Sequence, residues 1–569
     1  MGYSLSRVLQ CGTKMRKGIS RVDRDVQKSH CPEGDSVTTF DITPDKFRHW
    51  DLSLDAEIAT LTLTVDPTAS TFGTYELKLN SYDIGVDIEL ANAIRHIRLT
   101  HPNVKCVVIT SGLEGTFCAG ANIRMLAAAD HSHKVNFCKY TNETRLEIEE
   151  ASALSGIKFL AAVNGACSGG GYELALACDH ILLVDDKSTS ISLPEVPLLG
   201  VLPGTGGLTR LTDKRHVRRD RADIFATKAE GMSGKEALDW GLVDELATPT
   251  KFGEAVARRA SDLAASTVRE EGEPIHLSPM ELKISEDRID YRWVKVRLFD
   301  SHAELKVFVD ADPEWLLRTA LELDDVLCRL RFDYPDIGTL ILQTEGSIDS
   351  AAHLDAALFD STINGRSEIQ LLWKKCLTRL DLTAKTLVAA IEPGSCFVGI
   401  LFELALAADR IFMLDGRFED HDNPLPAASI RLTHSNFGTM PMWNDLSRLS
   451  SRFWGAEETL EALSPFSNVN ILADQAAQLG LVSATPDDLD WDDELRLSIE
   501  ERSSFSADAL TAMEANLRFS GPETMATKIF ARLSAWQNWV FTRSNASGPL
   551  GALQRYGSGS RPEFDNRRT

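Results

Sequence analysis

The chain has 569 residues, of which 83 are acidic and 60 are basic, so its formal net charge at pH 7 is −23. At the usual ~100–200 residues per domain, this length predicts about three or four structural units with substantial cores. Hydrophobic residues make up 43% and charged residues 25% of the chain, which excludes collagen-like, coiled-coil and wholly disordered proteins. The acidic balance argues against partners such as nucleic acid or an anionic membrane.

The distribution of cysteines and of apolar residues limits the kinds of site that we expect. Ten cysteines are scattered through the chain without a CxxC pair, a usage typical of reduced thiols in the cytoplasm rather than of a zinc site. Apolar runs are interrupted by Gly and Pro before they reach the roughly 18 residues that span a bilayer. We therefore expect a cytoplasmic protein with no metal site and no membrane segment.

In chain order, residues 1–36 are basic and lack hydrophobic periodicity, which predicts a disordered N-terminal extension or an over-long start. A targeting peptide is the alternative, although the segment has no apolar core or small-residue cleavage site. From Asp51 onward, strand patterns such as the alternation over 58–65 and the apolar run over 104–110 are interleaved with helical patterns. This interleaving predicts an α/β layer architecture. A stretch rich in Glu, Gly and Pro that ends near Pro274 predicts a linker.

Two segments of the chain recur beyond this linker in the same order. YELALACDHI, beginning at Tyr172, returns as FELALAADRI beginning at Phe402, and the pattern Ala-x3-Gly-Leu-Val beginning at Ala237 returns at Ala476. Two ordered matches predict duplication of one fold. Helical patterns follow the second copy. The predicted units are 1–36, 37–275, 276–500 and 501–569, the last a helical region with a Gly/Ser/Pro/Arg-rich tail.

Small residues mark two candidate ligand-binding loops in the first copy. Residues 117–122 read Phe-Cys-Ala-Gly-Ala-Asn ahead of a helical pattern, so the backbone N–H of Ala121 could face a ligand, although a tight turn is an alternative. Gly169, Gly170 and Gly171 precede an apolar helix, where free N–H groups stabilise an anion or a developing oxyanion. Neither loop matches a phosphate-binding or dinucleotide fingerprint.

Two glutamates follow these loops. Glu173 falls in the first turn of the apolar helix, where an acid is favourable for structural reasons as well as for catalysis. Glu195 lies between two prolines and apolar neighbours, so poor solvation would raise its pKa and suit it to proton transfer, unless it is a surface turn acid. The later Gly-rich turn at 203–207 has no accompanying Lys or Ser of a phosphate loop, and we interpret it as structural.

Taken in order, these motifs resemble the crotonase (enoyl-CoA hydratase/isomerase) superfamily. The resemblance implies an α/β fold of tandem crotonase-like ββα-superhelix domains with a C-terminal helical extension. It also implies an acyl-CoA thioester substrate whose carbonyl accepts hydrogen bonds from the backbone N–H groups of Ala121 and Gly170. Glu173 and Glu195 match the two catalytic carboxylates of that superfamily. Further pocket candidates are Gly169, Gly171 and Asn122.

The second copy departs from this pattern. Ile400 and Leu401 stand where the first copy has glycines, and the position of the Pro-Glu pair reads Pro426-Ala427. Glu403 alone remains. Without the oxyanion donors, it is predicted to be a helix-capping acid in a scaffold that has lost its site.

Residues 134–145, 192–219 and 556–564 carry a further resemblance, which extends over nearly all of 37–569. It is to the ring-cleaving branch of the superfamily that acts on epoxidised benzoyl-CoA. This resemblance implies hydrolysis of 2,3-epoxybenzoyl-CoA by two waters to 3,4-dehydroadipyl-CoA semialdehyde and formate, in aerobic benzoate degradation. It implies a homodimer with no metal or redox cofactor. The alternatives are an enoyl-CoA hydratase or isomerase, another hydrolase of aromatic acyl-CoA, and a non-catalytic acyl-CoA-binding scaffold.

Overall fold

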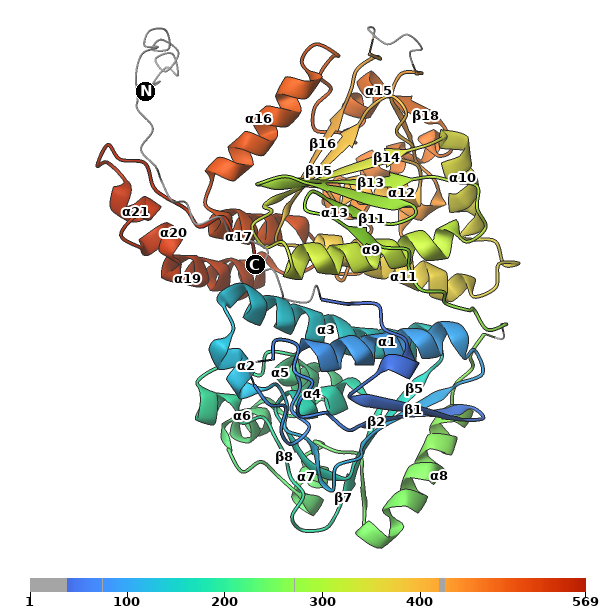
Figure 1. The fold of residues 1–569 in the computed structure, drawn as a ribbon, viewed down its shortest axis with the longest axis vertical. Helices are drawn as coiled ribbons and strands as arrows, with labels where there is room; N and C mark the ends of the chain where they lie inside the picture. The colour runs from blue at the N-terminus through green and yellow to red at the C-terminus, as the bar shows by residue number, and fades with distance from the viewer. Residues whose placement is uncertain (1–37, 74, 271, 419–424) are drawn as a thin grey trace. The chain divides into compact units, whose positions relative to one another are not determined.

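The computed structural model describes residues 38–73, 75–270, 272–418 and 425–569, so the predicted extension at 1–36 lies outside the described residues. Two large sheets, each covered by helices, occupy the described chain (Figure 1). We call the part from β1 (Trp50–Asp55) to α8 (Phe252–Ala265) the first half. The part from β10 (Lys283–Ile284) to α15 (Ala473–Gln478) is the second half.

The sheet of the first half begins with an antiparallel hairpin and continues with parallel strands, in the order β1-β2-β3-β5-β7-β9. Val107 and Ile109 of β3 belong to the core that includes α1, whereas Cys106 and Val108 pack with α8 on the other face. This alternation follows from the two-residue period of a strand. The elements are β1 (Trp50–Asp55), β2 (Ile58–Leu63), α1 (Ile84–Thr100), β3 (Cys106–Ser111), α3 (His131–Leu154), β5 (Lys158–Val163), β7 (His180–Val184), α6 (Arg219–Thr227), α7 (Gly234–Asp239), β9 (Glu245–Ala247) and α8 (Phe252–Ala265).

A second, small sheet of the first half gathers the candidate loops. Its three parallel strands are β4 (Gly115–Cys118), β6 (Gly165–Ser168) and β8 (Ile191–Ser192). They lead respectively into α2 (Ile123–Ala128), α4 (Gly170–Ala177) and a π-helical turn, Glu195–Leu199. Because parallel strands end at the same edge of a sheet, the three segments that follow them meet there.

The large sheet of the second half repeats the first half's run of one antiparallel pair followed by parallel strands, and it has two further antiparallel strands at its start. Its strand order is β10-β11-β12-β13-β14-β15-β16, antiparallel up to β13 and parallel afterwards. Gly399 precedes α12 with φ 50° and ψ −115°, close to the φ 53° and ψ −128° of Gly169 before α4. The predicted duplication is therefore confirmed at the level of fold, while the exact domain boundaries stay a prediction.

The strands of the large second sheet are β10 (Lys283–Ile284), β11 (Arg288–Asp290), β12 (Val294–Leu298), β13 (His302–Phe308), β14 (Thr339–Glu345), β15 (Thr386–Ile391) and β16 (Arg410–Met413). A separate pair consists of β17 (Ser429–Arg431) and β18 (Asn470–Leu472). The helices are α9 (Trp315–Phe332), α10 (Ile348–Ala357), α11 (Arg366–Asp381), α12 (Ile400–Leu406), α13 (Arg448–Arg452), α14 (Glu457–Ala462) and α15 (Ala473–Gln478).

The C-terminal region is helical, as predicted. It contains α16 (Trp491–Ser504), α17 (Ala507–Arg518), α18 (Met525–Thr527), α19 (Ser534–Thr542), α20 (Ser544–Ser547) and α21 (Ala552–Arg555). The end of the chain is buried, because Arg568 pairs with Glu514 of α17 and its backbone N–H donates to Pro335 O at 3.0 Å.

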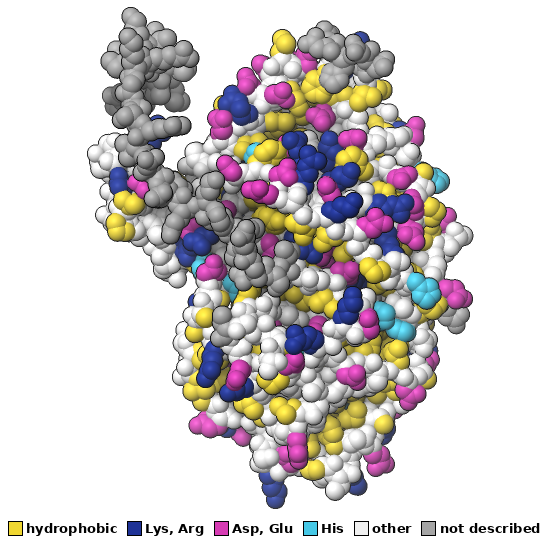
Figure 2. Space-filling view, viewed as in Figure 1, with side chains coloured by type: hydrophobic (Ala, Val, Ile, Leu, Met, Phe, Trp, Pro, Cys, Tyr) yellow, Lys and Arg dark blue, Asp and Glu magenta, His cyan; other side chains and the backbone are white. Residues whose placement is uncertain are grey.

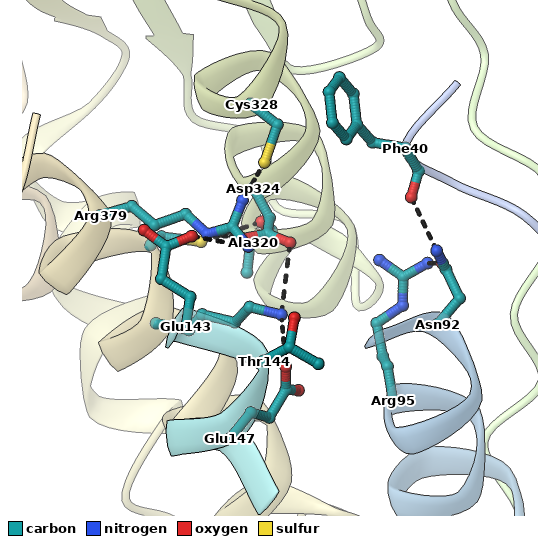
Figure 3. A network of polar contacts seen from close by, with 12 residues as sticks. Phe40, Asn92, Arg95, Glu143, Thr144, Glu147, Ala320, Asp324, Cys328 and Arg379 are labelled. Atoms are coloured by element: carbon teal, nitrogen blue, oxygen red, sulfur yellow. Dashed lines mark hydrogen bonds and ion pairs between the residues drawn. The ribbon is translucent and has the colours of Figure 1, made fainter. Parts of the chain in front are cut away.

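Buried charges join α3 of the first half to α9 and α11 of the second (Figure 3). Glu147 contacts Lys375 at 2.9 Å, while Arg379 lies 3.5 Å from Glu143 and 3.1 Å from Asp324. Burial alone would raise the pKa of Glu143, but neighbouring guanidinium groups lower it below its ordinary value. The Glu143 carboxylate is therefore a charged partner in the packing of the two halves.

Basic side chains on the face drawn in Figure 2 gather over the second sheet, with acidic side chains among them. Two partly exposed pairs on this sheet are Arg297–Glu304 and Lys306–Glu345, and Arg292–Asp312 joins two connections beside it. Charge of both signs is thus interspersed there. Among the described residues, none of the helices has both the length and the apolar character needed to cross a bilayer.

Candidate active site

The first candidate donor, the Ala121 amide, lies in a loop held by Tyr82. The Tyr82 N–H donates to Gly120 O at 3.0 Å, and the Asn122 N–H donates to Tyr82 O at 2.8 Å. These two hydrogen bonds flank Ala121 in a parallel pairing, so the Ala121 N–H points away from Tyr82. The Ala121 N–H accordingly has no partner among the described residues.

The second candidate donor, the Gly170 amide, is the first N–H of α4. Its neighbour Gly169 donates to Ser192 O at 2.9 Å, but the Gly170 N–H has no partner within the described chain, as is usual for a helix N-terminus. Gly120 has φ +83°, and a Cβ atom there would lie 2.8 Å from the Gly170 nitrogen. Only glycine allows this approach. The two loops with free amides are therefore in contact.

Glu173 is fixed by the Gly-rich turn that follows Glu195 in sequence. Its Oε1 accepts from the N–H groups of Thr205 at 3.0 Å and Gly207 at 2.8 Å, and its Oε2 accepts from the Thr205 hydroxyl. We predicted this turn to be purely structural, and its role in holding the carboxylate was missed. The Gly-x-Gly-Gly spacing, which leaves backbone N–H groups accessible, is the signal that could have indicated it.

Glu195 begins the π-helical turn and is 9% exposed, so its interpretation as a surface turn acid is wrong. A Cβ atom on Gly169 would lie 2.7 Å from Glu195 Oε1, and Glu195 Oε2 is buried without a hydrogen-bond partner. Burial raises the pKa of Glu195 to about 7, and repulsion from the Glu173 carboxylate adds to this effect. Glu195 can therefore exchange a proton near neutral pH.

The remaining pocket candidates have local roles in the structure. A Cβ atom on Gly171 would lie 2.5 Å from Cys118 O, so Gly171 allows α4 to pack against the end of β4. The Asn122 side chain accepts from the Met125 N–H at 3.0 Å and caps α2. Gly169 contacts Glu195, as described above. Of these three, Gly169 is the one in contact with a candidate catalytic carboxylate.

The corresponding place in the second half is filled by internal contacts. The Ile400 N–H, equivalent to that of Gly170, donates to Asp355 Oδ1 at 2.7 Å. Glu403 accepts from Asn436 at 2.8 Å and pairs with Arg448 at 3.0 Å. The prediction that Glu403 is a helix-capping acid is therefore wrong, because its carboxylate binds side chains instead. The role of Asp355 could not be recognised from the sequence, because it lies 45 residues before Ile400, whose N–H it accepts.

A cavity of about 310 Å³ lies beside α2, one turn beyond the Ala121 loop. Its walls are largely aromatic and apolar and come from both halves of the chain. The His133 ring contacts Phe72 and Phe332 edge to face, at centroid distances of 4.8 and 6.2 Å. Other lining residues are Tyr75, Met125 and Ala128. The cavity is large enough for an aromatic acyl group.

Comparison with known proteins assigns the family. The enoyl-CoA hydratase/isomerase family model matches residues 76–272. Benzoyl-CoA-dihydrodiol lyase of Aromatoleum evansii is 48% identical over 541 residues, which cover 92% of this chain and 96% of that protein. The fatty acid oxidation complex subunit alpha of Shewanella loihica is 38% identical over 30% of this chain and 25% of its own length. A crystal structure of enoyl-CoA hydratase from Bacillus anthracis is 25% identical, with TM-score 0.32, over 38% of this chain and 77% of that one. The chain belongs to the crotonase (enoyl-CoA hydratase/isomerase) superfamily, in the family that includes benzoyl-CoA-dihydrodiol lyase.

Proposed function

We propose that this protein is a lyase that opens the ring of 2,3-epoxybenzoyl-CoA with two waters. The products would be 3,4-dehydroadipyl-CoA semialdehyde and formate, as in aerobic benzoate degradation. The observation that carries the proposal is the 48% identity to benzoyl-CoA-dihydrodiol lyase along nearly the full length of both chains. The alignment with the fatty acid oxidation complex subunit alpha of Shewanella loihica, by contrast, covers only 30% of this chain.

The free amides of Ala121 and Gly170 would bind the thioester carbonyl oxygen. Negative charge develops on this oxygen when water attacks the conjugated ring, and two fixed N–H donors stabilise that charge more than they stabilise the neutral carbonyl. In other oxyanion holes, loss of one such donor lowers the rate by about 10²–10³-fold. The thioester would thereby act as the electron sink for the ring.

The two glutamates would divide the proton transfers between them. Glu195, with its pKa near 7 and an unpartnered oxygen, is suited to donate a proton to a leaving oxygen or carbon and to take one from water. Glu173 is held in one orientation by Thr205 and Gly207 and would orient the attacking water.

Two hydrolytic steps need an acid, a base and an oxyanion site, and together they cause no net oxidation. We therefore propose that turnover needs neither a metal nor a redox cofactor. From the sequence resemblance we also propose a homodimer located in the cytoplasm. Size-exclusion chromatography with light scattering would test the oligomeric state.

Product analysis tests the proposed reaction. Freshly epoxidised benzoyl-CoA is incubated with the protein in EDTA and in H₂¹⁸O, without nicotinamide, and formate and the acyl-CoA product are measured by mass spectrometry. We expect formate release with label from water in the products. A marked preference for crotonyl-CoA would instead indicate an enoyl-CoA hydratase. Binding of both thioesters without turnover of either would indicate an acyl-CoA-binding scaffold.

A further inference from the structure

Tyr82 contacts the loops of both candidate oxyanion donors. Its backbone forms hydrogen bonds on either side of Ala121, to Gly120 O at 3.0 Å and from the Asn122 N–H at 2.8 Å. Its side chain reaches the other donor, because a Cβ atom on Gly170 would lie only 1.9 Å from the Tyr82 hydroxyl oxygen. The phenol therefore packs directly against the Cα atom of Gly170.

The Tyr82 side chain is itself fixed by rigid neighbours. Arg145 lies over the ring at 5.4 Å from its centroid, and Phe137 packs against it at a centroid distance of 5.9 Å. Arg145 is 1% exposed in its side chain and is paired with the buried Asp87 of α1. A continuous set of contacts thus connects α1 and α3 to the N-terminus of α4 through one ring.

The hydroxyl has no hydrogen-bond partner although Tyr82 is only 3% exposed. Burial raises the pKa of Tyr82 well above its ordinary value, so the group is an uncharged O–H. A buried unpartnered hydroxyl lowers stability, and phenylalanine would avoid this cost. The contact of the oxygen with Gly170 is what the hydroxyl provides that phenylalanine would not.

We propose that Tyr82 is a positioning residue that sets the separation between the Ala121 and Gly170 amides. Its main chain fixes the first donor and its hydroxyl oxygen limits the approach of the second. This proposal rests on the oxyanion hole of the proposed function but not on ring cleavage. The carbonyl of any CoA thioester bound at the two amides is polarised according to their spacing, so a substrate that is not cleaved can also be used.

Tyr82→Phe is the direct test, and its readout is the ¹³C chemical shift of the carbonyl in bound [carbonyl-¹³C]benzoyl-CoA and crotonyl-CoA. Two aligned donors polarise the carbonyl and move its resonance downfield. In Tyr82→Phe we expect this displacement to decrease. We also expect kcat to fall by about 10- to 100-fold with a smaller change in KM, because a displaced donor acts mainly on the transition state. The melting temperature should stay equal or rise.

Tyr291→Phe is the matched control. Tyr291 is a buried tyrosine of the second half whose hydroxyl donates to Asp325. Removal of this hydroxyl should lower the melting temperature and leave the carbonyl resonance of the bound thioester unchanged. A double-mutant cycle that combines Tyr82→Phe with Gly170→Ala, followed by melting temperature, adds a second measurement. The new methyl group clashes with the Tyr82 hydroxyl, so Gly170→Ala should destabilise the protein less when Phe occupies position 82.

Two results would overturn the proposal: an unchanged carbonyl shift and kcat in Tyr82→Phe, or strictly additive melting temperatures in the cycle. Failure of the proposed function gives a different outcome. In that case the wild-type protein releases no formate from the epoxide, while the carbonyl shifts of the bound thioesters and the cycle still report on Tyr82.

Discussion

Glu195 combines burial, an unpartnered oxygen and a nearby carboxylate, and its raised pKa makes a pH-dependent prediction. Its pKa of about 7 in the folded protein lies above the ordinary value of 4.5, so the folded state holds this proton more tightly than the unfolded chain does. The associated stability is present below about pH 4.5 and is lost as the pH rises through 7. Glu195→Gln remains uncharged, so it should raise the melting temperature more at pH 8 than at pH 5.

Glu195→Gln should also change the dependence of kcat on pH. The profile of kcat against pH should show an inflection near 7 that disappears in Glu195→Gln, together with a fall in kcat of about 10²–10⁴-fold. Equal changes in melting temperature at both pH values, or an inflection that persists, would contradict the assignment. Stopped-flow or discontinuous assays between pH 5 and 9 provide the measurement.

Glu173 and Glu403 form a matched pair of buried glutamates at equivalent places in the two halves. Glu173→Gln should lower kcat by about 10²–10⁴-fold, because the amide cannot transfer the proton. Glu403→Gln should leave kcat unchanged and lower stability, because Arg448 loses one of its two charged partners. Loss of activity in Glu403→Gln without unfolding would contradict the interpretation of the second half as a scaffold.

At this scale the sequence identifies residues whose local pattern is distinctive. Small residues before a helix indicated Ala121 and Gly170, and the proline neighbours of Glu195 indicated its poor solvation. Thr205 could not be recognised in the same way, because an ordinary turn residue acquires its role only when folding brings it to a carboxylate 32 positions earlier. The interpretation of Glu403 failed for the same reason, since Arg448 lies 45 positions later.

At the scale of elements, the turn before α5 (Gly207–Thr209) and the helix α4 act as one unit that holds the Glu173 carboxylate. A Cβ atom on Gly207 would lie 2.9 Å from Glu173 Oε1. Gly207→Ala should therefore displace the carboxylate and lower kcat with little loss of folding. Gly253→Ala in α8 is the control, because nothing lies within 4 Å of the added atom.

The control variant should keep its kcat and gain stability. Alanine is favoured over glycine within a helix by roughly 0.5–1 kcal/mol, so Gly253→Ala should stabilise the protein and keep full activity. Steady-state kinetics and urea unfolding of the two variants make the comparison. Equal kcat values for Gly207→Ala and the wild-type protein would show that the turn does not fix the carboxylate.

At the scale of the whole molecule, the ion pairs between α3 and the helices α9 and α11 couple the two halves. Arg379 is 4% exposed and contacts both Glu143 and Asp324. Arg379→Met would leave two buried carboxylates with too few partners, so we expect a loss of about 3–5 kcal/mol in the free energy of unfolding. Arg496→Met, which breaks exposed pairs on α16, should cost less than about 1 kcal/mol.

Urea unfolding followed by fluorescence and circular dichroism measures both values. Similar losses in the two arginine variants would contradict a coupling role for the buried network. The sequence predicted two copies of one fold because the repeated segments are local. It could not predict how the copies pack, because Glu147 and Lys375 are 228 positions apart and each is an ordinary helix-surface residue in its own segment.

Asp355 carries a consequence for any attempt to make the second half reactive. Its carboxyl group already accepts the Ile400 N–H, so a thioester oxygen arriving there would find that donor occupied. Reinstating the glycines and the missing glutamate would therefore not suffice to engineer a second catalytic centre. Asp355 would first have to be replaced by a smaller, neutral residue. The side chains that pack around it would then have to tolerate the cavity that this replacement leaves.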